Sequence, residues 1–144
     1  MIGSAPSYTL GPRDETAVRN FLAHHPVDGC LIAARIDAVG ISGASGSGEL
    51  CAYYSDLGLA ALWLDGPSLV LVGDPDGSGR MLEAMISRNA AHRRRCSSIV
   101  GPADVVVPLW SALAPAWGPA REVRPNQPLL ALDTAPLVEP LPGL

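Results

Sequence analysis

The sequence predicts a single domain of the α/β class (α+β), with helices packed on a mixed sheet. The chain has 144 residues, of which 48% are apolar and 17% charged, and this composition supports one core and excludes general disorder. Two segments with apolar residues at helical spacing come first, and three short apolar runs separated by turn signals follow them. Neither strict alternation of strands and helices nor an all-strand spacing fits this order, so a mixed sheet is the economical architecture.

Two short helices are predicted at the start of the chain. Asp14-Glu15-Thr16 offers a cap and an acidic first turn, and apolar residues recur at helical spacing until Pro26. We expect Asp28 to cap the second helix, which Gly40 ends. Residues 41–48, with the sequence ISGASGSG, carry small side chains after the isoleucine and are predicted to form a mobile loop.

An antiparallel meander of three strands is predicted next, because strong turn signals separate the apolar runs. The runs cover residues 50–55, 59–64 and 68–72. A tight loop over residues 73–79 leads to a helix that ends in the triple arginine 93–95. These arginines favour the negative end of the helix dipole and are interpreted as a solvated helix end, with an anion site as the alternative.

A strand over 96–100 is followed by a helix that Asp104 is expected to cap, and Trp110 on this helix is predicted to join the core. Trp117 is expected in a loop, where a partner can reach it. The last predicted strand, over 121–123 and 129–132, is an edge strand because prolines interrupt it. The predicted order is thus helix, helix, three strands, helix, strand, helix, strand, for a domain over residues 1–133 with a proline-rich tail over 134–144.

Composition excludes several classes of function. The net charge of −4 disfavours a nucleic-acid surface, and the ten basic residues are all arginine, which leaves no lysine for a Schiff base or a phosphate. The apolar runs are too short to cross a bilayer, so no membrane partner is expected. The chain has an odd number of cysteines, and they lack the spacing of a metal site: Cys30, Cys51 and Cys96. We therefore expect buried, reduced thiols and no bound metal. Reduced thiols also indicate a cytoplasmic protein.

Three stretches carry a resemblance to a known family: FLAHHPVDGCLIAARID from Phe21, RRCSSIVGPADVVVPLW from Arg94 and WGPAREVRPNQPLLALD from Trp117. They resemble the region that precedes the catalytic domain in two-domain bacterial GNAT acyltransferases, over roughly Asp14 to Asp133. The resemblance implies an acetyltransferase-like fold here and places the chemistry in a C-terminal GNAT domain. That domain, or self-association, is the partner that we expect.

In the GNAT superfamily, a glycine-rich loop between the fourth strand and the following helix holds the pyrophosphate of acyl-CoA. The resemblance places this loop at 73–80, so Gly77, Ser78, Gly79 and Arg80 are the candidate cofactor-binding residues if acetyl-CoA binds. Asp74 and Asp76 put two carboxylates in the same loop, and their charge disfavours a diphosphate. We therefore expect no cofactor in this segment.

No catalytic residue is predicted. The candidates for a base or an acid are few, and each has an ordinary structural role available: Glu49, Tyr53, Tyr54, His24, His25 and His92. The leading hypothesis is a non-catalytic GNAT-like domain that supports or regulates an acyltransferase domain. The alternatives are an acetyl-CoA-dependent N-acyltransferase that uses the 73–80 loop, and a module of the same fold that binds a small ligand or a protein.

Overall fold

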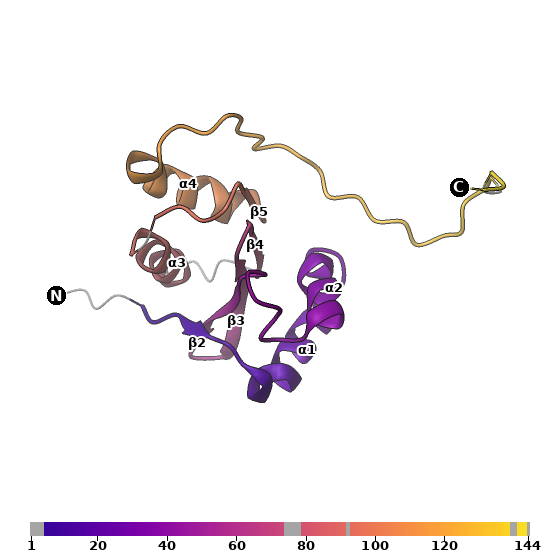
Figure 1. The fold of residues 1–144 in the computed structure, drawn as a ribbon, viewed down its shortest axis with the longest axis horizontal. Helices are drawn as coiled ribbons and strands as arrows, with labels where there is room; N and C mark the ends of the chain where they lie inside the picture. Colours follow the sequence, from indigo (N-terminus) through magenta and orange to yellow (C-terminus); the bar gives the residue numbers. More distant parts are fainter. Residues whose placement is uncertain (1–4, 74–78, 92, 139–140, 144) are drawn as a thin grey trace.

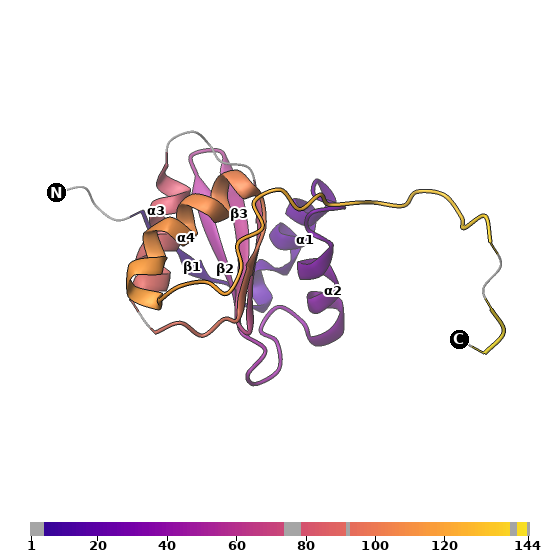
Figure 2. The same cartoon turned by 90° about the horizontal axis from the view of Figure 1, so that it is seen from above.

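The computed structural model describes residues 5–73, 79–91, 93–138 and 141–143. The elements form three layers, with a five-stranded sheet between two pairs of helices (Figures 1 and 2). In chain order they are β1 (Tyr8–Thr9), a 3-10 turn η1 (Pro12–Asp14), α1 (Glu15–Ala23), α2 (Cys30–Val39), β2 (Glu49–Ser55), β3 (Gly58–Asp65), β4 (Ser68–Gly73), α3 (Arg80–Ala90), β5 (Ser98–Val100) and α4 (Ala103–Trp117).

The sheet is mixed, as predicted. Its spatial order follows the chain from β1 to β5. The first four strands pair antiparallel, and β5 lies parallel to β4 because α3 carries the chain back across the sheet before β5 begins. The predicted meander is confirmed, with β2, β3 and β4 each starting or ending within a residue of the expected bounds.

Both faces of the sheet are buried, which explains why its strands read as continuous apolar runs rather than as alternating patterns. On β2, Cys51 and Tyr53 face the core beneath α3 and α4, whereas Leu50 and Ala52 face the core beneath α1 and α2. Trp63 of β3 is fully buried in the core beneath α3 and α4. The two cores fix the sheet from both sides and hold its ends in place.

Two parts of the predicted order are wrong. The strand β1 was not expected, and the final strand over 121–123 and 129–132 is absent, because the chain after α4 is an exposed coil. Among the described residues, the last regular element is α4, which ends at Trp117. In both views the later part of the segment after α4 runs away from the body (Figures 1 and 2).

Several local expectations also need correction. Gly29 and Pro102, not Asp28 and Asp104, occupy the positions that precede α2 and α4. Asp14 does precede α1, but its carboxylate accepts a hydrogen bond from the backbone N–H of Gly11 rather than from the helix.

The tryptophans and one cysteine also differ from expectation. Trp110 is only half-buried, and Trp117 is the last residue of α4 and packs against the core instead of lying in a loop. Cys51 and Cys96 are buried as expected, but the expectation of a buried Cys30 is wrong, because this thiol is exposed at the start of α2. No helix among the described residues is long and apolar enough to cross a membrane.

Candidate functional site

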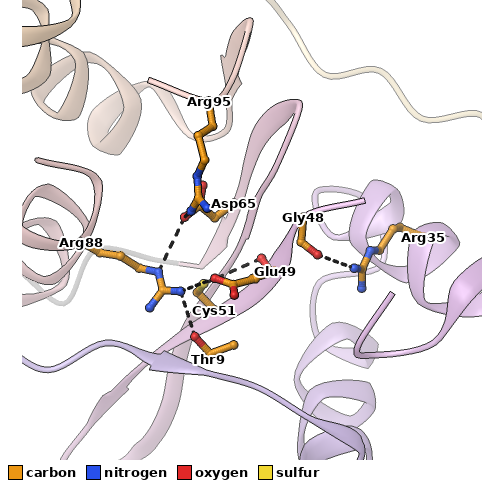
Figure 3. Close-up of polar contacts among 8 residues, drawn as sticks. All are labelled: Thr9, Arg35, Gly48, Glu49, Cys51, Asp65, Arg88 and Arg95. Carbon is orange, nitrogen blue, oxygen red and sulfur yellow. Dashed lines mark hydrogen bonds and ion pairs between the residues drawn. The ribbon is translucent and has the colours of Figure 1, made fainter. Parts of the chain in front are cut away.

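Five polar residues meet at one end of the sheet, beside α3, and we call them the polar cluster: Thr9, Glu49, Asp65, Arg88 and Arg95 (Figure 3). Glu49 and Asp65 are direct cross-strand partners on β2 and β3. Two carboxylates at opposite positions of an antiparallel pair repel each other. The arrangement therefore needs positive charge nearby, and the two arginines supply it.

Arg88 of α3 bridges the two strands. Its Nη2 atom donates to the Glu49 carboxylate and to the Thr9 hydroxyl, each at 2.8 Å, and its Nε lies 3.7 Å from the Asp65 carboxylate. Arg95 donates to the same Asp65 oxygen at 2.7 Å from the segment between α3 and β5. The cluster thus ties α3, β1, β2, β3 and the approach to β5 at one point.

The Asp65 side chain is only 3% exposed, so its charge lies out of solvent and depends on the arginines for compensation. Cys51 lies beside it, and its burial raises the pKa of the thiol to about 12. The thiol is therefore neutral at physiological pH and acts as an apolar side chain, not as a nucleophile.

The cluster contains three groups spaced as metal ligands are. Oxygen or sulfur atoms of Glu49, Cys51 and Asp65 lie within 4.8 Å of one another. A cation there has to displace two guanidinium groups from the carboxylates and deprotonate a thiol whose pKa is raised. These contacts favour a network of ion pairs over a metal centre.

Two hollows flank the cluster and share Glu49 and Arg95 on their walls. One, of about 510 Å³, lies between residues 5–7 and α3. The other, of about 480 Å³, lies against the loop of residues 42–48. Both are wide open to solvent, and their walls are mainly small or charged side chains, so neither has the apolar lining typical of a cofactor pocket.

The 42–48 loop is held in place by Arg35 of α2. Both terminal nitrogens of Arg35 donate, to the backbone oxygens of Gly40, Ile41 and Gly48 and to the Ser47 hydroxyl, at 2.8 to 3.2 Å. Figure 3 shows the bond from Arg35 to Gly48. A loop anchored at both ends by one side chain differs from the mobile loop that its small residues predict.

The predicted cofactor loop is only partly described. Asp74, Asp76, Gly77 and Ser78 lie outside the described residues. Gly79 precedes α3 with φ of +75°, a left-handed conformation that favours glycine, and no side chain of the described residues caps the helix. Arg80 is the exposed first residue of α3.

The candidate acids and bases are spread over the fold and are not brought together into one site. Glu49 is bound by Arg88, and Tyr53 is buried in the core. Tyr54 lies near the opposite end of β2 from Glu49, and its ring meets the ring of Tyr8 edge-on. The remaining candidates are histidines.

Two of these histidines have local partners near the end of α1. Nδ1 of His24 is within hydrogen-bond distance of the Asn20 carbonyl, and Nδ1 of His25 lies 3.1 Å from Asp28 while its ring stacks on Phe21. His92 lies outside the described residues. The pair Glu15–Arg19 within α1 and the pair His25–Asp28 in the turn after it are therefore local contacts, not parts of a shared active site.

Comparison with known proteins assigns a family. Residues 48–144 match a family described as a domain of unknown function, DUF4081. The chain belongs to this family. The DUF4081 match begins at the anchored loop and covers β2 to β5, α4 and the exposed segment after it. No curated protein and no solved structure matches the chain.

The polar cluster was missed by sequence reasoning, although Glu49 was considered as a base and Arg95 as part of a solvated helix end. The DUF4081 match includes four of the five cluster residues, all except Thr9. The one available signal was a charged residue at the end of an apolar strand, Asp65, which was interpreted as part of a turn. Its partners Glu49, Arg88 and Arg95 are 16 to 30 positions away along the chain, and no local pattern links them.

Proposed function

We propose that this domain is a non-catalytic module of GNAT-like architecture that packs against a GNAT-family N-acetyltransferase domain and supports or regulates it. The observation that carries the proposal is the surface of α4. This helix covers the core with one side and remains apolar on the side that faces outward.

Helix α4 contains one charged residue, Asp104, among its 15 residues. Its buried residues are Val105, Leu109 and Leu113, yet the side chain of Val107 is 37% exposed and Trp110 is only half-buried. A helix that is apolar on all sides is normally covered on all sides. Its neighbour α3, which packs on the same core, has charged residues at three of its 11 positions and fits an outer, solvated helix.

The outward side of α4 is too small to hold a partner alone. A helix of 15 residues is about 22 Å long, and a strip about 10 Å wide gives roughly 220 Å², against about 800 Å² per partner in a stable interface. The segment after α4 adds exposed apolar residues, among them Val123, Leu129, Leu130 and Leu132. The family match covers this segment.

The order of the elements supports the acyltransferase-like part of the proposal. Because β1 precedes the helices, β4 is the fourth strand of the chain, and the 74–79 loop leads from it into α3. The resemblance to GNAT acyltransferases places the acyl-CoA loop between a fourth strand and the next helix. From the same resemblance we infer that the domain that binds the α4 surface is an acyltransferase domain.

The docking experiment compares a variant of α4 with a variant of α2, which lies on the opposite face of the sheet. Val107→Asp puts a charge on the outward side of α4, and Ala34→Asp puts the same charge at an exposed position of α2. We expect the unchanged chain and Ala34→Asp to form a complex with an acyltransferase domain encoded beside this chain, measured by sedimentation velocity, and Val107→Asp to bind at least about tenfold more weakly. Equal binding by both variants would refute docking through α4.

One observation favours the alternative, an acetyl-CoA-dependent acyltransferase. Gly79, the residue before α3, has no side chain to cap the helix, and helix N-termini attract anions. Titration with acetyl-CoA, followed by calorimetry and thermal shift, separates the two hypotheses. The non-catalytic module predicts no shift of the melting temperature at millimolar acetyl-CoA, whereas stabilisation that Gly79→Asp abolishes would establish the alternative.

A further inference from the structure

The hollow between residues 5–7 and α3, of about 510 Å³, exists because small side chains face each other across it. Ala84, Ser87 and Ala91, the last of which directly follows α3, recur at helical spacing and therefore lie on one side of the helix. The opposite wall, at positions 5–7, has the sequence APS. These walls leave room for a small ligand beside the charged residues of the polar cluster.

Arg88, on the wall of this hollow, has hydrogen-bond donors that its contacts with the described residues do not use. Its Nη2 atom donates to Glu49 and to Thr9. Nη1 carries two further N–H groups, and no described residue accepts a hydrogen bond from them. Nε is buried without a hydrogen-bond partner, 3.7 Å from the Asp65 carboxylate. The ion-pair network therefore explains the position of Arg88 but leaves Nη1 available to a ligand.

Glu49 supplies an acceptor on the wall of the same hollow. Its Oε2 atom accepts the bond from Arg88 at 2.8 Å, and no donor among the described residues reaches Oε1. The Glu49 side chain is 53% exposed, so a ligand can approach this carboxylate from solvent. The hollow thus has an available donor and an available acceptor on two side chains that are already in contact with each other (Figure 3).

The balance of charges in the polar cluster decides the class of ligand. Arg88 pairs with Glu49 and Arg95 pairs with Asp65, so two positive charges meet two negative ones. A dianion such as inorganic phosphate meets no excess of positive charge there, and a simple cation meets no excess of negative charge. An α-amino acid has no net charge at neutral pH, and it carries an ammonium group and a carboxylate on one carbon atom. Its two charges complement a guanidinium and a carboxylate that lie side by side.

We propose that this hollow binds a free α-amino acid with an uncharged side chain. The ligand carboxylate accepts hydrogen bonds from Nη1 of Arg88, the ligand ammonium group donates to Oε1 of Glu49, and the ligand side chain lies along the small residues of the walls. No residue of α4 lines the hollow, so the ligand leaves the α4 surface free for an acyltransferase domain. The site goes beyond the proposed function, and variants of α4 and of the hollow test the two proposals separately.

Titration of the full, isotope-labelled chain with each of the common L-amino acids tests the site, with the backbone amide shifts around Glu49, Arg88 and Ala91 as the readout. We expect at least one amino acid with an uncharged side chain to bind with a millimolar dissociation constant, because the hollow is open to solvent. The N-acetyl derivative of that amino acid lacks the positive charge, and its amide lacks the negative charge. Each should bind at least about tenfold more weakly. Inorganic phosphate is the probe for a site that takes simple anions.

Two substitutions assign the binding to the hollow. Ala91→Phe puts a large side chain on its wall and should abolish binding, whereas Ala90→Phe, at the exposed neighbouring position that does not line the hollow, should leave binding unchanged. Glu49→Gln keeps an oxygen that can accept from Arg88 but removes the negative charge. It should weaken binding of the amino acid at least about fivefold and should not weaken binding of the N-acetyl derivative, which has no ammonium group.

Four results would overturn the proposal. The first is the absence of shifts with every amino acid, and the second is equal binding of an amino acid and its N-acetyl derivative. The third is binding of phosphate without binding of any amino acid, which would make the hollow a site for simple anions. The fourth is a loss in Glu49→Gln that is the same for the amino acid and for its N-acetyl derivative, as a purely structural role of Glu49 requires. This last comparison stays decisive if Ala91→Phe fails to fold.

Discussion

Removal of the Arg88 guanidinium tests the role of the polar cluster most directly. In Arg88→Met the helix keeps a long apolar side chain of similar length, but the bonds to Glu49 and Thr9 and the charge beside Asp65 are lost. Glu49 and Asp65 then face each other across β2 and β3 with only Arg95 as compensation. We expect the folded state to be clearly destabilised, because Asp65 is almost entirely buried.

The magnitude follows from the exposure of each group. A hydrogen bond to a charged partner contributes about 1.5–3 kcal/mol when buried, but an exposed ion pair contributes less than about 1 kcal/mol. The bonds from Arg88 to Glu49 and Thr9 are partly exposed, because the Arg88 side chain is 19% exposed and Glu49 is 53% exposed. The 3.7 Å contact with Asp65 is an ion pair without a hydrogen bond, but solvent screens it weakly because Asp65 is 3% exposed. The sum predicts a loss of about 2–3 kcal/mol in the free energy of unfolding, or about 8–12 °C in melting temperature.

Urea unfolding and thermal melting measure this loss, and a double-mutant cycle identifies its source. Arg88→Met should cost at least about 1 kcal/mol less in an Asp65→Asn background, because the charge that Arg88 compensates is gone. Arg94→Met, which removes an exposed arginine a few positions on, is the control and should change stability by less than about 0.5 kcal/mol. Equal losses for Arg88→Met in both backgrounds would refute the electrostatic explanation.

Three other expectations concern single positions. Arg35→Met should lower the free energy of unfolding by about 2–3 kcal/mol in urea titrations, because four acceptors in and beside the 42–48 loop lose their donor. Thiol labelling at pH 8 should modify Cys30 quickly and spare Cys51, and rapid loss of both thiols would contradict the burial of Cys51. Gly73→Ala should lower the melting temperature far more than Gly118→Ala, because only the former places Cβ within 2.6 Å of a backbone oxygen of β3.

The pKa of Cys51 also sets a pH dependence with a definite sign. Burial raises the pKa of this thiol from 9.0 to about 12, so the folded state favours the neutral form. The corresponding stability is complete below pH 9 and is lost as the pH rises toward 12. Cys51→Ala lacks this group, and its stability should fall less steeply over the same range; parallel curves for both proteins would contradict the assigned shift.

The helices and the meander were predictable because they depend on short-range patterns. Apolar residues three and four positions apart define α1 and α3, and turn signals separate β2, β3 and β4. The strand β1 was not predictable, because two exposed residues, Tyr8 and Thr9, carry no period. It forms because its backbone pairs with Ala52 and Cys51 of β2, which is a long-range contact.

The prediction of a final strand was wrong because local composition does not identify the partner of a strand. Residues 129–132 have the local composition of a strand, yet a strand forms only where a neighbouring edge accepts its backbone groups. Local preference therefore identifies a segment that is able to pair, but not the partner. The same limit applies to Trp110, whose helical spacing with Leu109 and Leu113 predicted burial but not the side of α4 that meets the core.

The absence of lysine, which excludes certain reactions, also has a structural meaning in this fold. Arg35 joins four acceptors from two nitrogens, and Arg88 joins groups on β1, β2 and β3. A planar guanidinium with five donors spans such separated acceptors, whereas the three donors of an ammonium group leave from a single atom. Both arginines reach from a helix to the same end of the sheet, where the ordinary apolar packing of the core stops. The basic residues that no sequence motif explained thus act as connectors between the layers, and this role accounts for their burial without a ligand.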